Sequence, residues 1–281
     1  MKRQFPAIVD DAARDTRDAL HAYARILGDC LKSSRSKRKH WWHASLRPSL
    51  VGWSTGIVHG EPDFELEINA RNSQLDIRTS TGESYIEPLI GQPAYQLADV
   101  VCDFLVATGV KNDIKSHINI DRNDARYFAG FSTEYANLLG RISSDITASL
   151  LEFRSGIREE TSPVQLWPHH FDLSMLWLPG DKMPDQDPDN EEYADKQMNF
   201  GFTFGDDGIP EPYFYVTAYP FPDGLSLVEL PDGTHWQTEG FTGAVLTYQR
   251  LLDEADPGAY LQQLWNGLLA EGRRHLINET T

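Results

Sequence analysis

Two short clusters of histidine and tryptophan are the residues of this sequence best suited to chemistry. One is HWWH at 40–43, and the other is WPHH at 167–170, in the second half of the chain. Imidazole exchanges a proton near neutral pH, and tryptophan offers a flat apolar surface on which a ligand can stack. If the two clusters meet in space, they predict a small-molecule site or an acid–base centre.

The segments 40–47 and 169–178 read as strands, and alternation then sorts their side chains by face. One face of the first segment would carry Trp41, His43, Ser45 and Arg47. In the second segment the core face would carry Phe171, Leu173 and Met175, and the opposite face His170, Asp172 and Ser174. The combined polar face offers an imidazole, a carboxylate and a fixed guanidinium, the groups used for proton transfer and for holding an anion.

Three functions remain open for these residues, among which the candidate catalytic residues are His43, His170 and Asp172. The first is a ligand-binding cleft, in which Arg47 holds an anionic group, Trp41 stacks and a histidine exchanges a proton. The second is a hydrolase-type enzyme, in which Asp172 orients His170 as a general base. The third is a structural or protein-interaction module, homodimeric through an exposed sheet face, in which the histidines only bond backbone carbonyls.

A row of tyrosines is the second feature that suits a ligand. In the segment EPYFYVTAYP, period-two alternation places Tyr213, Tyr215 and Tyr219 on one face of a strand. Such a face can line a pocket for a sugar ring or another planar ligand, so Tyr213 and Tyr215 join the candidate ligand-binding residues. The alternative is a half-buried sheet face packed under a helix or loop.

The sequence predicts no metal site and leaves any cofactor unidentified. The clustered histidines and Asp172 supply metal-binding side chains, but HExxH and CxxC motifs are absent. His40 and His43 would also lie on opposite faces of a strand, where they cannot share a metal ion. The two cysteines, Cys30 and Cys102, fall on the apolar sides of expected helices, so we expect buried free thiols.

Charge argues against one class of partner. The 281-residue chain has 42 acidic and 25 basic side chains and a formal net charge of −17, which opposes binding to a nucleic-acid backbone. That charge fits partners that are neutral, cationic or small. One basic island, KSSRSKRK at 32–39, is either a solvated connection or a pocket for an anion such as phosphate, to which its serines would donate hydrogen bonds.

The composition is that of a folded globular protein, with 40% hydrophobic and 24% charged residues. No apolar stretch reaches the length of a signal-peptide core or a membrane span. The sequence therefore predicts a cytoplasmic protein with a small-molecule ligand and no membrane partner.

Helical and alternating patterns predict an α+β fold, with antiparallel sheets on which amphipathic helices pack. We expect helices over 10–32, capped by Asp10 or Asp11, over 93–109 and 124–155, and from Asp256-Pro257 onward. We expect strands over 40–47, 53–59, 64–69, 74–80, 84–89, 162–167, 169–178, 196–204, 211–219 and 235–245. The order helix, strands, helix occurs twice, so residues 1–281 would form one globular unit with pseudo-symmetric halves at 1–122 and 123–281.

Four segments spread over most of the chain resemble a bacterial family of uncharacterised proteins, the domain-of-unknown-function family 5996. They are HWWHASL at 40–46, FELEINARNSQLDIRTSTG at 64–82, SPVQLWPHHFDLSMLWLPG at 162–180 and EPYFYVTAYPFPDG at 211–224. The resemblance implies that relatives often carry a histidine where Gln165 stands and a His-Glu pair where Lys196-Gln197 stands. If those residues form a metal or catalytic site in the family, this chain lacks part of it, which favours binding over catalysis. The resemblance supplies no activity and no substrate.

Overall fold

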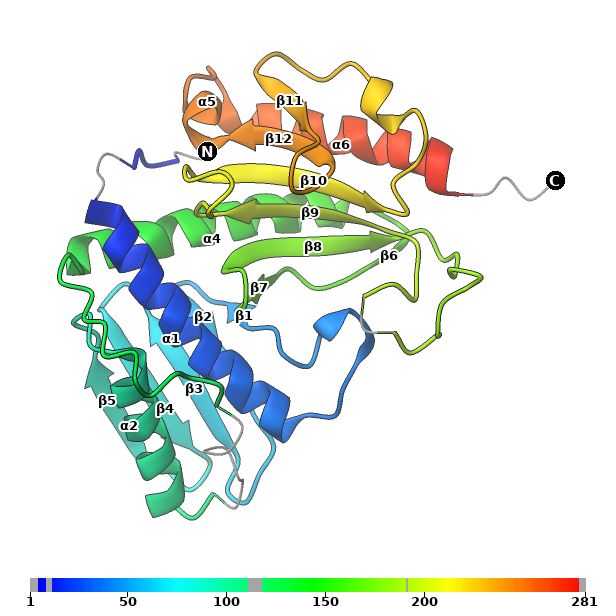
Figure 1. Cartoon of the computed structure of the whole chain (residues 1–281). Coiled ribbons are helices and arrows are strands. Elements are labelled where there is room, and N and C mark those ends of the chain that lie inside the picture. Colours follow the sequence, from blue (N-terminus) through cyan, green and yellow to red (C-terminus); the bar gives the residue numbers. More distant parts are fainter. Residues whose placement is uncertain (1–4, 9–11, 111–117, 191, 278–281) are drawn as a thin grey trace.

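The protein has an α+β fold with two antiparallel sheets, seen in a computed structural model that describes residues 5–8, 12–110, 118–190 and 192–277 (Figure 1). The first sheet has five strands in sequential order: β1 (Arg47–Pro48), β2 (Gly52–Ser54), β3 (Phe64–Asn69), β4 (Gln74–Thr79) and β5 (Ser84–Pro88). The second has seven strands in the order β11-β12-β10-β9-β8-β6, with β7 also paired to β8. Its strands are β6 (Glu160–Thr161), β7 (Gln165–Trp167), β8 (Asp172–Leu178), β9 (Gln197–Thr203), β10 (Tyr213–Tyr219), β11 (Thr234–Gln237) and β12 (Gly243–Thr247).

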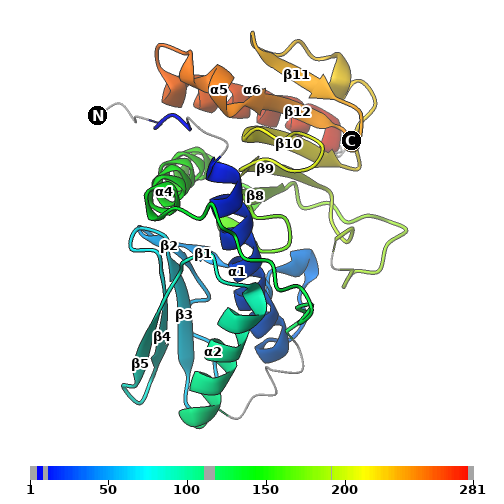
Figure 2. The ribbon, with the colours of Figure 1, turned by 60° about the vertical axis from the view of Figure 1, so that its left-hand side comes forward.

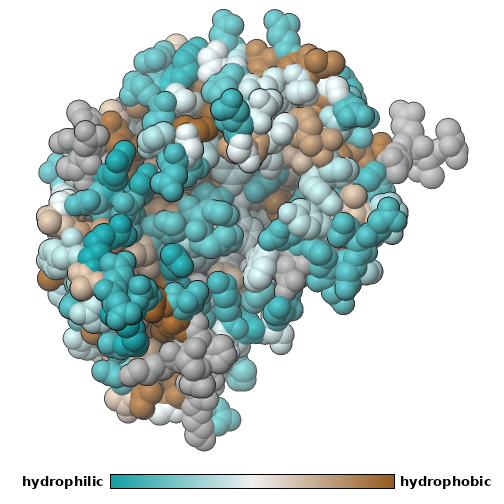
Figure 3. Space-filling model, in the orientation of Figure 1, coloured by the Kyte–Doolittle hydropathy of each residue, from teal (hydrophilic) through white to brown (hydrophobic). Residues whose placement is uncertain are grey.

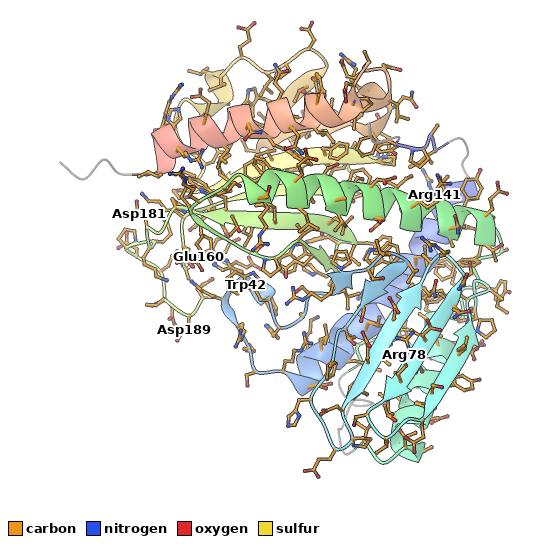
Figure 4. All side chains as sticks on the ribbon, turned by 180° about the vertical axis from the view of Figure 1, so that it is seen from behind. Trp42, Arg78, Arg141, Glu160, Asp181 and Asp189 are labelled. Carbon is orange, nitrogen blue, oxygen red and sulfur yellow. The ribbon has the colours of Figure 1, made fainter. Side chains whose placement is uncertain are left out.

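The helices cover one face of each sheet. They are α1 (Ala12–Ser34), α2 (Ala94–Ala107), α4 (Thr133–Ser155), α5 (Tyr248–Leu252) and α6 (Pro257–Leu276), with short 3-10 turns η1 (Lys39–Trp41) and η2 (Leu225–Leu227). Helices α1 and α2 lie on the same side of the first sheet (Figure 2). Helices α4 and α6 cover the second sheet and stand in front of it in Figure 4, which views the molecule from behind. Among the described residues, no helix covers the opposite face of the second sheet, which is called the front face below.

Alternation explains why the second sheet takes these helices on one face only. Leu173, Met175 and Trp177 of β8 are buried on the rear face, together with Phe200 of β9. The Phe200 ring lies 4.8 Å from the ring of Phe153 in α4. The polar residues of the same strands are therefore turned to the front face. The predicted sorting of Leu173 and Met175 against Asp172 and Ser174 is confirmed.

Several predicted elements differ from the structure. The first part of the predicted strand 40–47 is a tight turn, since His40 and Trp41 have positive φ angles of 55° and 53°. Only its end is extended, where Leu46 bridges to Leu166 and Arg47 begins β1. The predicted strand 235–245 is a hairpin, β11 and β12, whose connection contains Gly240 at a φ of 81°. The helix expected from 124 begins at Thr133, where Ser132 accepts a hydrogen bond from the Tyr135 amide as N-cap. Helix α5 is not predicted at all.

Other expectations are confirmed. The α+β class is right, β3 and β4 form a hairpin at Asn72-Ser73, and Asp256 caps α6. Cys30 and Cys102 are buried free thiols. The predicted caps Asp10 and Asp11 lie outside the described residues. The two sheets differ in strand number and strand order, so the pseudo-symmetric halves are not confirmed. Within the described ranges, no helix combines the length and apolar character needed to cross a bilayer.

Candidate functional site

The front face of the second sheet carries a cleft that we call the sheet cleft. It consists of two adjoining hollows of about 340 and 290 Å³ that share His170, Asp172 and Tyr215. The first hollow is lined further by His40, Trp41, Trp167, His169, Leu176, Glu192, Tyr193, Gln197 and Asn199. The second is lined further by Thr203, Asp206, Tyr213, Thr217 and Phe241. Figure 3 shows this side of the molecule, where the surface is hollowed beside the loop that follows β8 and is largely hydrophilic.

A hydrogen bond across three strands forms the centre of the cleft. The Tyr215 hydroxyl on β10 donates to Oδ2 of Asp172 on β8, and β9 lies between the two strands. Gly201 of β9 is the direct partner of Tyr215 in the ladder, and a Cβ at Gly201 would overlap the tyrosine ring. Because glycine has no side chain, the ring can lie flat over β9 and reach the carboxylate.

Asp172 is a buried carboxyl group with an unusual environment. It is 7% exposed, and its burial raises its pKa to about 6, while the Tyr215 hydrogen bond and the positive charge of nearby His170 oppose the rise. Burial also raises the pKa of Tyr215 well above its usual range, so the phenol stays a donor. Near neutral pH the cleft therefore holds a buried negative charge whose Oδ1 atom accepts no hydrogen bond from the described part of the chain.

Two further acceptors, toward the other end of the same cleft, are also without a hydrogen-bond donor among the described residues. The side-chain oxygens of Gln197 and Asn199, both on β9, are buried and accept no hydrogen bond from any described residue. Buried polar atoms are normally paired, because leaving one unpaired costs about 1–3 kcal/mol. Three unpaired acceptors that belong to the lining of one cleft indicate a ligand that brings its own donors.

Aromatic side chains form the walls of the cleft. Trp167 is buried, and its indole N–H donates to Ser174 Oγ at 2.7 Å. Trp41 is half-buried, and its indole N–H donates to Glu192 at 3.3 Å. Tyr193 packs on Tyr219, with ring centroids 4.8 Å apart. The lining offers flat surfaces and carboxylates but contains no lysine or arginine.

One carboxylate holds the turn that places Trp41 in the cleft. Asp195 is 6% exposed and accepts from Lys39 Nζ at 2.6 Å and from His40 Nε2 at 2.8 Å. Lys182 Nζ lies 2.7 Å from its other oxygen. Burial works to raise the pKa of Asp195, but the hydrogen bonds from these three partners outweigh it and lower the pKa. These contacts explain why 40–43 is a turn and not the predicted strand.

The cleft contains only part of the predicted site. Trp41, His170, Asp172 and Tyr215 meet there, and Tyr213 lies at one end with its hydroxyl donating to Asp206 at 2.6 Å. His43 and Arg47 line a separate hollow that shares no residue with the cleft. Because the η1 turn replaces the expected strand, Trp41 and His43 do not share one strand face, and the predicted combination of His43, Arg47, His170 and Asp172 does not form.

The histidines of the second cluster are exposed at the rim of the cleft. His169 and His170 have ring centroids 4.4 Å apart, and burial of the His169 ring, with the nearby charge of His170, lowers the His169 pKa to about 4. Within the described residues no hydrogen bond joins His170 to Asp172, whose Oδ2 accepts from Tyr215 and whose Oδ1 has no partner. The hydrolase hypothesis lacks the contact by which Asp172 would orient His170 as a general base.

Some important residues of the cleft were not among the predicted ones. Asp195, beside the cleft, and Asn199, in its lining, carry no sequence signal that distinguishes them from ordinary polar residues. Gln197 is marked only by the family resemblance, which implies a different residue there in relatives. Gly201 does carry a signal, since a glycine inside the alternating apolar run NFGFTF marks a place where something approaches the backbone closely. Among the residues that the structure describes, no group of three His, Cys, Asp or Glu side chains is placed to hold a metal ion.

The fold and the site together define an α+β protein with a polar, aromatic-walled cleft on the uncovered face of an antiparallel sheet. The chain belongs to the family of unknown function DUF5996, whose model matches residues 5–270, and the resemblance seen in the sequence is thereby confirmed. No curated protein and no solved structure matches the chain.

Proposed function

We propose that the protein binds a small amine in the sheet cleft. The observation that carries the proposal is the set of three buried acceptors, on Asp172, Gln197 and Asn199, that receive no hydrogen bond within the described part of the chain. A protonated amine brings up to three donors, which suit Asp172 Oδ1. Gln197 and Asn199 lie four or more residues along β9 from Thr203, the ladder partner of Asp172, so an elongated ligand such as a diamine reaches them with its other donors.

Charge favours an amine over a neutral polyol. Asp172 keeps a buried negative charge near neutral pH, and neither lysine nor arginine lines the cleft to neutralise it. Glu192 and Asp206 add carboxylates at the two ends, and the whole chain has a net charge of −17. A cationic ligand is attracted by this field and gains a charge-assisted hydrogen bond at Asp172.

The aromatic walls support the same ligand class. Trp41, Trp167 and Tyr215 contribute ring surfaces to the lining. A cation near the face of such rings gains about 0.5–2 kcal/mol, depending on how far it is desolvated. The anionic ligand considered from the sequence depended on Arg47, which lies outside the cleft.

Calorimetric titration with putrescine, ethanolamine, glucose and acetate tests the proposal. We expect the two amines to bind and the other two compounds to show no heat of binding at the same concentrations. Asp172→Asn removes the charge and is expected to weaken amine binding by about tenfold to a hundredfold, the range for one hydrogen bond to a charged group. Asp76→Asn is the matched control, since Asp76 is a 6% exposed carboxylate on the first sheet, paired with Arg78 at 3.2 Å.

Three results would overturn the proposal. One is the absence of binding by either amine to the unmodified protein at millimolar concentration. Another is an amine affinity that is the same in the Asp172→Asn variant as in the unmodified chain. Glucose binding stronger than that of the amines would also exclude the amine and assign the cleft to a polyol.

A further inference from the structure

A separate hollow lies next to the sheet cleft, and its lining is basic where that of the cleft is acidic. It has a volume of about 490 Å³ and is lined by Arg35, Ser36, Arg38, Trp42, His43, Arg47 and Pro163; we call it the arginine pocket. Trp42, which follows η1, is labelled in Figure 4. The η1 turn separates the two sites, since His40 and Trp41 line the cleft and the next two residues line the arginine pocket.

In the part of the chain that the structure describes, none of the three arginines is paired with an acidic side chain, although the protein is strongly acidic. The lining of the pocket contains no carboxylate, and none of these arginines forms an ion pair with a described Asp or Glu residue. Burial, together with the positive charges of Arg47 and Arg38, lowers the pKa of Arg35. Burial also lowers the pKa of Arg47. The positively charged guanidinium groups repel one another in this partly buried pocket, and a bound anion would offset that repulsion.

Two of the guanidinium groups are held in place by neutral partners. Arg35 Nη2 donates to the backbone oxygen of Thr55 at 2.9 Å, and Arg47 Nη1 donates to Gln165 Oε1 at 3.3 Å. Each guanidinium has five N–H donors, so these bonds fix the groups and use only part of their capacity. A site whose charged groups are fixed in advance loses little freedom when a ligand arrives.

Neutral donors near the arginines also lack acceptors. The indole Nε1 of Trp42 and the amide Nε2 of Gln165 are buried and have no hydrogen-bond partner among the described residues. In the described part of the chain, the cleft therefore has buried acceptors without donors, whereas the surroundings of the arginine pocket have buried donors without acceptors.

We propose that the arginine pocket binds a small molecule that bears a phosphate group. Phosphate offers several oxygens to planar guanidinium groups, which bind it bidentately. The hollow exceeds the size of one phosphate ion, and Trp42 supplies a ring surface for the remainder of the ligand. This inference does not rest on the amine proposal, because the two sites share no lining residue.

Titration with phenyl phosphate, inorganic phosphate and benzoate, followed by calorimetry, tests this site. We expect phenyl phosphate to bind more tightly than inorganic phosphate and benzoate to bind at least about tenfold more weakly than phenyl phosphate, since a monoanion makes fewer charge-assisted bonds. Arg47→Gln and Arg38→Gln are each expected to weaken phenyl phosphate binding by about tenfold or more. Arg38 is exposed, so that variant is not expected to disturb folding.

Matched control variants distinguish binding in the arginine pocket from binding in the sheet cleft and from a nonspecific effect of removing one positive charge. Arg141→Gln makes the same charge change at an exposed position on α4 (Figure 4) and should leave the affinity for phenyl phosphate unaltered. Asp172→Asn should also leave it unaltered, and Arg47→Gln should leave amine binding unaltered. The proposal is overturned if phenyl phosphate does not bind at millimolar concentration, or if Arg38→Gln and Arg141→Gln weaken binding equally.

Discussion

Replacing Asp195 by alanine is expected to lower the free energy of unfolding by about 2–4 kcal/mol at pH 7.5. Removing one partner of a buried ion pair costs about 3–5 kcal/mol when the remaining charge stays buried. Here Lys39 and Lys182 have side chains that are 29% and 58% exposed and can turn to water, so the expected loss is somewhat smaller than that range. His40, whose side chain is 1% exposed, cannot turn outward and loses its Asp195 partner. Urea unfolding monitored by circular dichroism measures the difference.

The loss should depend on pH in a defined direction. The folded-state pKa of Asp195 lies below its ordinary value of 3.8, so the unfolded chain binds more protons in the acid range. The stabilisation is therefore fully present above about pH 4 and is lost as the pH falls below that value. The difference in free energy of unfolding between the unmodified protein and the Asp195→Ala variant should therefore become smaller below about pH 4.

A nearby aspartate provides the control for this variant. Asp181 lies in the same loop, is 39% exposed at its side chain and pairs with Lys196 at 3.1 Å. Asp181→Ala is expected to cost less than about 1 kcal/mol, as exposed ion pairs do. Hydrogen exchange over 38–43 should accelerate only in the Asp195 variant. Equal stability losses, or unchanged exchange in that segment, would show that Asp195 does not hold the turn.

The elements that local pattern determines are the ones that could be predicted from the sequence. β8 alternates between apolar and polar residues, and this pattern placed Asp172 on the correct face because one side of the sheet is buried under α4 and α6. The tyrosines of β10 were placed correctly for the same reason. Amphipathic helices and the Asp256 cap follow from spacing within a single segment.

The features that could not be predicted from the sequence depend on contacts between residues far apart in the chain. The bond from His40 to Asp195 spans 155 positions, and it makes a turn of a segment whose local pattern favours a strand. The contact of Tyr215 with Asp172 depends on the absence of a side chain at Gly201, on a strand between them. Arg47 is separated from the cleft because it pairs with Gln165, 118 positions away. Periodicity contains no information about such contacts.

Replacing Asp172 by asparagine is expected to stabilise the protein at pH 7.5 by about 1–3 kcal/mol. Burial raises the pKa of Asp172 from 3.8 to about 6, which means that the folded state disfavours the charged carboxylate by on the order of 1–3 kcal/mol. Asparagine removes that charge, and part of the gain is lost with the charged hydrogen bond from Tyr215. The folded state binds the extra proton, so the penalty is absent below pH 3.8, grows between pH 3.8 and about 6, and is constant above. The stability gained by the Asp172→Asn variant should depend on pH in the same way. Thermal unfolding of both proteins across pH 4–8 measures it.

The sign of this effect separates a binding residue from a structural one. Asp76→Asn removes a carboxylate that is paired with Arg78 and accepts from Gln74 at 2.6 Å, so that variant should be destabilised. A structural role for Asp172 requires the same sign, a loss of stability at both pH 4 and pH 7.5. A gain at pH 7.5 that disappears at pH 4, in a variant that no longer binds amines, shows a buried charge retained at a cost in stability. Residues kept in that way are typical of binding sites, where the ligand supplies the missing partner.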